Sequence, residues 1–204
     1  MSKLTVTREV NTRIPTDYGD FQLCFYSNTQ DSKEHLALFM GNLNERKSVL
    51  ARIHSECFTG DVLGSRRCDC GEQLDRSMKM ISETGVGVIV YMRQEGRGIG
   101  LLEKLRAYNL QDEGLDTVDA NIELGHEADA RDYSLAALIL RDLEVRSVDL
   151  ITNNPGKIHA LEDLGIPVTK RVSLEIAAHP DNVSYLQTKA QRMNHLLKIK
   201  TIKN

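Results

Sequence analysis

Three cysteines lie close together in the first third of the chain, with the spacing Cys57-x10-Cys68-x-Cys70. Thiolates are soft ligands that suit zinc, and three protein ligands leave the fourth position of a tetrahedral ion open to water. A purely structural zinc site usually has four protein ligands, so a set of three cysteines favours a hydrolytic centre. A closed structural site remains the alternative, with Cys24 or His54 as the fourth ligand.

A glycine-rich stretch at residues 94–100 follows an apolar run and precedes a predicted helix. Backbone N–H groups at a helix start bind anions, and glycines let a phosphate approach closely. Arg93 and Arg97 favour a pyrophosphate or triphosphate partner, because guanidinium groups bind phosphate through two hydrogen bonds. Lys104 and Arg106 could add to this charge or lie on a solvated helix face. A flexible turn without a ligand is the alternative, since the stretch matches neither common nucleotide-binding glycine motif.

Polar residues also follow the predicted strand at 147–152. Ligands of open α/β sheets bind at the carboxyl ends of strands, so Thr152 and Asn153 could contact a base or ribose and Lys157 a phosphate. A turn that caps the next helix explains the asparagine equally well. Asp129 and Arg131 are ambiguous alone, because acidic residues are common at helix N-termini.

The elements that must position these residues form a simple pattern. Residues 1–50 are predicted to be β-rich, with short strands at 4–10, 21–26 and 36–40. Further strands are predicted at 48–54, 86–92, 147–152 and 167–172. Helices are predicted at 72–84, from the glycine-rich stretch to about 112, and at 130–143, 157–164 and 184–200. The alternation predicts a single α/β domain over residues 1–204, with a mixed or parallel sheet, helices on both faces and a C-terminal helix.

Composition excludes several classes of protein. The formal charge of −3, the pI near 6.1 and an aromatic content of 5% without tryptophan argue against nucleic-acid binding. No apolar run approaches the roughly 20 residues of a membrane helix, and the N-terminus has no signal-peptide pattern. Four cysteines that include a C-x-C pair do not resemble a secreted disulfide framework. We therefore expect a cytoplasmic protein without a membrane partner.

Six segments carry further distinctive residues, in collinear order. They are Arg52-x-His54-Ser55-Glu56-Cys57-x-Thr59-Gly60-Asp61, Arg67-Cys68-Asp69-Cys70-Gly71, Arg93-Gln94-Glu95-Gly96-Arg97-Gly98-Ile99-Gly100-Leu101, Ala107-Tyr108-x-Leu110-Gln111-Asp112, Asp116-Thr117-Val118-x-Ala120-Asn121 and Leu150-x-Thr152-Asn153-Asn154-Pro155. Together they resemble the GTP cyclohydrolase II family, over about residues 48–197. The first 45 residues resemble it only loosely.

The resemblance implies an enzyme that opens the imidazole ring of GTP, releases formate and pyrophosphate, and begins riboflavin biosynthesis. It implies one Zn²⁺ per chain on Cys57, Cys68 and Cys70, Mg²⁺ with the triphosphate, and a homodimer. Asp129 and Arg131 match the family's base and nucleophile, and Tyr108 matches a catalytic tyrosine. The implied nucleotide contacts are Arg52, Ile53, His54, Ser55, Glu56, Gln73, Glu95, Gly96, Arg97, Thr117, Thr152 and Lys157.

Three questions stay open at this level. Arg131 could act as a nucleophile or could stabilise transition-state charge, because a guanidinium group is costly to deprotonate. The chain could be a paralogue that stops at a formamidopyrimidine or GMP product. It could also be a zinc-binding module without catalytic activity, although the acidic balance disfavours a nucleic-acid partner.

Overall fold

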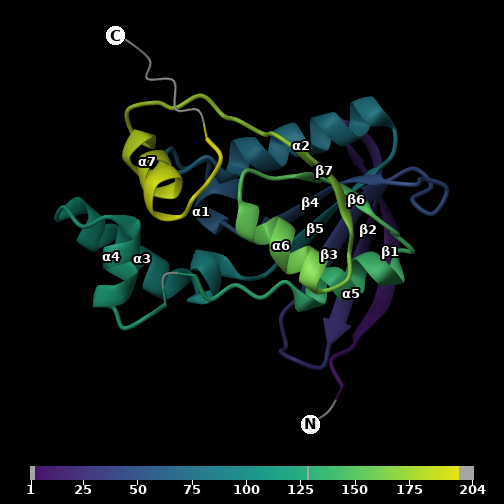
Figure 1. Ribbon diagram of the computed structural model, residues 1–204, viewed down its shortest axis with the longest axis horizontal. Helices are drawn as coiled ribbons and strands as arrows, with labels where there is room; N and C mark the ends of the chain where they lie inside the picture. The colour runs from purple at the N-terminus through teal and green to yellow at the C-terminus, as the bar shows by residue number, and fades with distance from the viewer. Residues whose placement is uncertain (1–2, 128, 198–204) are drawn as a thin grey trace.

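The computed structural model describes residues 3–127 and 129–197, and its centre is one mixed β-sheet (Figure 1). The strand order is β1-β2-β3-β5-β4-β6-β7. Neighbours from β1 to β5 are antiparallel, whereas β5, β4, β6 and β7 run parallel. The strands are β1 Val6–Thr16, β2 Gly19–Asn28, β3 His35–Met40, β4 Val49–Ser55, β5 Gly87–Met92, β6 Val148–Ile151 and β7 Val168–Val172.

Helices cover both faces of the sheet, as the sequence predicted, and others gather at one end of it (Figure 1). α2 packs on one face, and α5 and α6 pack on the other. The helices are α1 Phe58–Asp61, α2 Cys70–Thr84, the 3-10 helix η1 Glu95–Gly98, α3 Leu101–Asp112, α4 Thr117–Glu123, α5 Ser134–Asp142, α6 Pro155–Asp163 and α7 Val183–Arg192. None of those in the described ranges is long and apolar enough to cross a membrane.

The two-residue period of the strands divides the core between these faces. On β5, Val88 and Val90 join the larger cluster beneath α5, and Ile89 between them packs against α2. The α2 side is anchored by Ile81, which is fully buried with Phe21 and Ile89. Gly85 ends α2 in the left-handed conformation, at φ 73°, where glycine has no steric penalty. The predicted end of this helix is therefore confirmed.

The N-terminal strands are much longer than predicted. β1 and β2 form a continuous hairpin that turns at Asp17 and Tyr18. β1 is an edge strand and most of its side chains are exposed, so it carries no hydrophobic alternation for the sequence to display. The prediction of a strand limited to residues 4–10 was wrong for this reason.

Two helix predictions also need correction, and two short helices were not predicted. α5 begins at Ser134, not at residue 130, and the Asp132 carboxylate accepts hydrogen bonds from the Ser134 backbone N–H and hydroxyl in a turn that precedes the helix. α4 was missed, although Asp116 caps it with two backbone contacts. α7 ends at Arg192, earlier than the predicted helix over 184–200, of which residues 198–200 lie outside the described ranges. The short α1 was not predicted either.

We expect Ile81→Ala to lower the free energy of unfolding by about 2–5 kcal/mol, because it leaves a cavity between α2 and the sheet. For a chain of this length, that loss corresponds to a fall in Tm of roughly 5–15 °C. Thermal unfolding followed by circular dichroism measures it. Lys79→Ala, at an exposed position of the same helix, is the control and should leave Tm nearly unchanged. Equal Tm values for the two variants would contradict this packing.

Candidate active site

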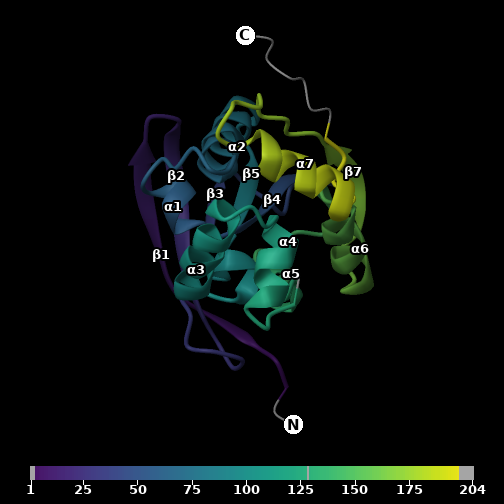
Figure 2. The same cartoon turned by 90° about the vertical axis from the view of Figure 1, so that its left-hand side faces the viewer.

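A cavity lies where the carboxyl ends of the parallel strands meet. Figure 2 looks towards this edge, with α3, α4 and α7 in front of the strand ends. The segments that follow β4, β5 and β6 contribute to its lining, as do α2, α3 and the chain around α7. Most of the predicted nucleotide contacts line it, namely Arg52, His54, Ser55, Glu56, Gln73, Glu95, Gly96, Arg97, Thr117, Thr152 and Lys157.

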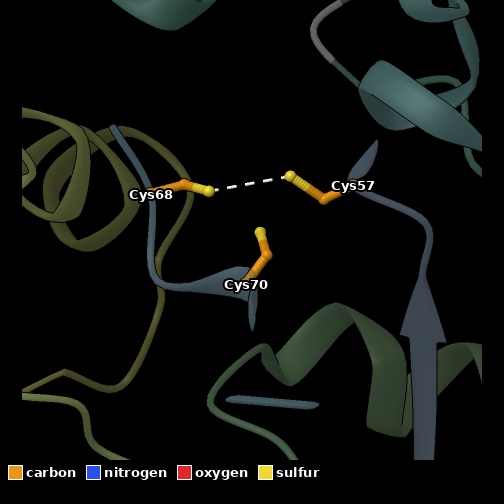
Figure 3. Close-up of side chains that lie close together, drawn as sticks. All are labelled: Cys57, Cys68 and Cys70. Atoms are coloured by element: carbon orange, nitrogen blue, oxygen red, sulfur yellow. Dashed lines mark hydrogen bonds between the residues drawn. The ribbon is translucent and has the colours of Figure 1, made fainter. Parts of the chain in front are cut away.

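The three cysteines converge on this cavity (Figure 3). Cys57 follows β4, and Cys68 and Cys70 lie at the start of α2. The Sγ atoms of Cys57 and Cys68 are 3.6 Å apart, and all three sulfurs lie within 4.8 Å of one another. Around a tetrahedral zinc ion with Zn–S bonds of about 2.3 Å, neighbouring sulfurs would be about 3.8 Å apart. The donor set and its spacing therefore fit a zinc ion.

Neither proposed fourth ligand joins this cluster. Cys24 is fully buried in the core beneath α5. The His54 ring is engaged on both nitrogens: Nδ1 accepts from Arg52 Nε at 3.2 Å, and Nε2 lies 3.0 Å from Asp61 Oδ2. Within the described ranges, the candidate metal group contains the three cysteines alone.

Two glycines allow the cysteine segments to approach. A Cβ atom on Gly60 would lie 2.9 Å from Cys68 Sγ and 3.1 Å from Cys57 Sγ. A Cβ atom on Gly71 would lie 2.3 Å from the carbonyl oxygen of Gly60. A larger side chain at position 60 would therefore displace the sulfurs, and one at position 71 would push apart the backbones of α1 and α2.

The thiols also titrate as a group. Hydrogen bonds from Cys68 and Cys70, followed by the nearby ammonium of Lys104, lower the pKa of Cys57. The hydrogen bond to Cys57 raises the pKa of Cys68 to about 11, and hydrogen bonds to the other two thiols, with burial, raise the pKa of Cys70. Closely spaced negative charges disfavour one another, so a cation among the three sulfurs would favour their ionisation together. This chemistry also suits a divalent metal.

The rest of the cavity has a surplus of cationic side chains. Its lining includes Arg52, Arg97, Lys104, Arg131, Lys157 and Lys189, but only Glu56, Asp69 and Glu95 as acids. Burial, together with the nearby charges of Arg131 and Arg52, lowers the pKa of Lys157 well below its ordinary value. Its Nζ donates to the carbonyl oxygen of Ile53 at 2.7 Å. An anion beside these groups would favour the charged form of the lysine, so the cavity suits a polyphosphate.

Four predicted site residues do not line the cavity, namely Ile53, Arg93, Arg106 and Asp129. Arg93 instead pairs with Glu56, with 3.0 Å between Nε and Oε2. The Ile53 side chain belongs to the hydrophobic core, and its contribution is the carbonyl oxygen that accepts from Lys157. Asp129 pairs with Arg131, whose Nε donates to Asp129 Oδ1 at 2.7 Å and whose Nη2 donates to Oδ2. Arg131 itself lines the cavity, so Asp129 holds it from behind.

Tyr108 projects from α3 towards the cysteines. Its hydroxyl lies 3.4 Å from Thr59 Oγ1, which in turn lies 3.8 Å from Cys57 Sγ. The guanidinium of Arg67 is 4.9 Å from the centre of the tyrosine ring, and Lys104 Nζ is 5.6 Å from it. Burial raises the pKa of Tyr108, so its phenol stays protonated at neutral pH.

Lys104 and Arg106 have different surroundings although they are two positions apart on α3. Lys104 is buried, and its Nζ lies 3.1 Å from Cys57 Sγ. Arg106 pairs with Glu103, and 58% of its side chain is exposed. Of the two explanations left open by the sequence, the solvated face therefore applies to Arg106, and Lys104 reaches the cysteine cluster.

The C-terminal segment contributes residues that sequence reasoning missed. Lys189 on α7 donates to Asp69 Oδ1 at 2.7 Å, and Asp69 also accepts from Gln73 Nε2 at 2.5 Å. Gln73 in turn accepts from Arg52 Nη2 at 2.6 Å. This chain of polar contacts joins α7 to α2 and β4. Nothing in the sequence around residues 183–197 indicated a site, because its polar face has the composition of a solvated helix.

These features define the class as an α/β protein with a candidate metal centre of three cysteines beside a cation-lined cavity. The sequence model of the GTP cyclohydrolase II family matches residues 7–173. The chain belongs to the GTP cyclohydrolase II family. The match includes the N-terminal strands, so it extends further towards the N-terminus than the motifs alone indicated.

Two curated relatives, both named riboflavin biosynthesis protein RibBA, are similar to this chain. The protein from Bacillus mycoides (strain KBAB4) is 55% identical over 194 residues, which cover 95% of this chain and 49% of the relative. The protein from Salinispora tropica is 57% identical over 186 residues, which cover 91% of this chain and 46% of the relative. The chain thus spans about half the length of these relatives.

Among solved structures, a match covers 98% of this chain at a TM-score of 0.41 and 19% identity. It is the crystal structure of RibBX, a two-domain 3,4-dihydroxy-2-butanone 4-phosphate synthase from A. baumannii.

We expect Gly60→Ala to weaken Zn²⁺ binding, because the added Cβ atom would displace the sulfurs of Cys57 and Cys68. Competition with a chromogenic chelator measures the affinity, which we expect to fall by at least about tenfold. Gly64→Ala is the matched control, since a Cβ atom there meets nothing within 4 Å. Its φ of +64° predicts a loss of stability of about 1 kcal/mol without a change in zinc affinity. Wild-type affinity in Gly60→Ala would contradict the close-approach argument.

Proposed function

We propose that this chain catalyses the GTP cyclohydrolase II reaction: hydrolytic opening of the imidazole ring of GTP with release of formate and pyrophosphate. The product would be 2,5-diamino-6-ribosylamino-4(3H)-pyrimidinone 5′-phosphate, and the reaction would begin riboflavin biosynthesis. The observation that carries the proposal is the cluster of Cys57, Cys68 and Cys70 opening onto a cavity with a surplus of cations. Family membership and the names of the relatives support it.

In this proposal Cys57, Cys68 and Cys70 hold one zinc ion. When bound, zinc would supply Lewis acidity and lower the pKa of water at its open position to about 7. Tyr108 stays protonated, because burial raises its pKa, so its hydroxyl can donate to a purine ring nitrogen as water adds at the neighbouring carbon. Arg52, Gln73, Arg97, Thr152 and Lys157 would hold the nucleotide, with the buried cations on the phosphates.

Arg131 would act on the α-phosphorus, where the bond to pyrophosphate breaks. Burial would lower the pKa of its guanidinium, but Tyr133 and Asp129 outweigh that effect and raise it. At Asp129, burial would raise the pKa of the carboxyl group, but the hydrogen bond and the charge of Arg131 outweigh burial and lower it. An ionised Asp129 beside a protonated Arg131 favours charge stabilisation over attack by a guanidine nitrogen, because deprotonation becomes still more costly.

The proposed function extends to a second metal ion, the extent of the domain, the assembly of the chain and its location. Mg²⁺ would accompany the triphosphate and neutralise charge that the lysines and arginines do not reach. Residues 1–204 would act as one GTP cyclohydrolase II domain, including the β-rich residues 1–50. The chain would form a homodimer and would work in the cytoplasm, where a reducing environment keeps thiols available for metal. We expect neither a nucleic-acid nor a membrane partner.

The decisive experiment incubates the protein with GTP, Zn²⁺ and Mg²⁺ and identifies the products by absorbance and mass spectrometry. We expect formate, pyrophosphate and the diaminopyrimidine. Cys68→Ser should lose zinc and at least about 10²-fold in activity, because one of three ligands is removed. Cys24→Ser, in the core away from the cluster, should retain one zinc per chain.

The outcomes separate the alternatives. A product that retains the formyl carbon, or GMP with pyrophosphate alone, would indicate a paralogue that stops early. A folded, zinc-loaded protein without turnover would indicate a binding module. Loss of zinc in Cys24→Ser would overturn the open three-cysteine site.

We expect Arg131→Lys to slow pyrophosphate release by about 10²-fold or more, because lysine cannot reproduce the paired contacts to Asp129 or the planar donor set. Single-turnover assays with α-labelled GTP measure the step. No labelled covalent adduct should accumulate on the wild-type protein if the arginine stabilises charge. An isolated adduct would instead establish the nucleophile, and wild-type pyrophosphate release in Arg131→Lys would exclude both roles.

A further inference from the structure

Lys104 is a buried cation that the proposed reaction leaves without a task. It lies on α3, 11% of its side chain is exposed, and its Nζ makes two close polar contacts. One is to Cys57 Sγ at 3.1 Å and the other to Glu95 Oε1 at 2.8 Å. Cys57 is one of the three candidate metal ligands, and Lys104 contacts it directly from a different element.

Glu95 holds Lys104 in this position. Its Oε1 also accepts from the Gly96 backbone N–H at 2.9 Å, and its Oε2 accepts from the Phe58 backbone N–H at 2.6 Å. Phe58 directly follows Cys57, so the glutamate links the lysine to the backbone of the cysteine segment. With only 8% of the Glu95 side chain exposed, solvent does little to weaken the pair.

Gly96 makes room for this arrangement. A Cβ atom on Gly96 would lie 3.1 Å from Cβ of Lys104, and the φ of Gly96 is +62°. Gly96 therefore does more than let a phosphate approach the backbone. It also lets Lys104 of α3 pack against η1.

A cation at this point has a chemical effect on a metal held by thiolates. Three thiolates around a divalent ion leave one net negative charge and donate strongly, which reduces the ion's Lewis acidity. An N–H···S hydrogen bond from an ammonium group withdraws electron density from one sulfur and offsets that charge. Outer-shell contacts of this kind orient ligands and tune metal sites.

We propose that Lys104 is a positioning residue of the metal centre, which holds Cys57 through an N–H···S hydrogen bond and restores Lewis acidity to a metal bound by three thiolates. The inference rests on the zinc site of the proposed function. It assigns Glu95 the task of fixing Lys104, in addition to its place in the cavity lining. The competing explanation is a buried ion pair between Lys104 and Glu95 that contributes to folding alone.

The first test compares wild type with Lys104→Met, which keeps an unbranched side chain one atom shorter and removes the charge and the donors. Zn²⁺ affinity is measured by chelator competition, and we expect it to fall by about 10- to 100-fold, because the loss of a cation that holds Cys57 and stabilises the net negative metal–thiolate group outweighs the stronger donation of the freed sulfur. The Co²⁺-substituted protein provides a second readout. Its sulfur-to-cobalt charge-transfer band should move to longer wavelength, because the loss of the hydrogen bond raises the energy of the sulfur electrons. Neither readout depends on turnover.

A double variant separates tuning from folding. Lys104→Met alone leaves Glu95 buried without its cation, whereas Glu95→Gln with Lys104→Met is neutral and still accepts from Phe58 through the amide oxygen. We expect the double variant to regain the Tm of the metal-free wild type but to keep the weakened Zn²⁺ affinity and the shifted band. If the ion pair served folding alone, both metal readouts would return to wild type together with Tm.

Arg106→Met is the matched control, since it removes an exposed cation from the same helix. It should leave zinc affinity and the cobalt band unchanged. Wild-type affinity and an unshifted band in Lys104→Met would overturn the inference, as would their recovery in the double variant. If the shifts occur but the wild type does not convert GTP, the proposed function fails and the role of Lys104 stands.

Discussion

Three sulfur atoms within 4.8 Å of one another disfavour a negative charge on all three, and a cation among them would offset this repulsion. The strand β4 delivers Cys57, and the start of α2 delivers Cys68 and Cys70. Gly60 and Gly71 let the two backbones touch. Further along α2, Ile81 packs the helix against Phe21 and Ile89 of the sheet, and this packing holds the start of the helix beside Cys57.

The cavity beside the sulfurs is lined by basic side chains and therefore favours an anion. Burial lowers the pKa of Lys157, and the nearby charges of Arg131, Arg52 and Lys189 lower it further. The cavity therefore has two ends of opposite character, a cluster of thiols that favours a cation and a group of basic side chains that favours an anion. Both ends are buried, so the interactions there are stronger than the same pairs would be in water.

The C-terminal segment, residues 183–197, contacts the cysteine segment and also lines the basic cavity. Lys189 neutralises Asp69, which lies between two of the cysteines, and Arg192 forms ion pairs with Asp116 and Asp119 at the start of α4. The family match ends at residue 173, whereas the similarity to the Bacillus mycoides relative covers 95% of the chain. Residues beyond the family match therefore complete the cavity wall, through Tyr185, Lys189 and His195.

The sequence by itself determined the alternation of strands and helices, the end of α2 at Gly85 and the three-cysteine spacing, because periodicity, turn residues and ligand spacing are local properties. It did not reveal the length of β1, whose exposed side chains carry no hydrophobic pattern, or the late start of α5 at Ser134. Only the tertiary structure decided that His54 pairs with Asp61, that Lys104 contacts Cys57 and that α7 reaches Asp69. These contacts join residues from different segments, and Lys189 and Asp69 are 120 positions apart. Only the packing of α1, α2, α3 and α7 at the edge of the sheet brings them together.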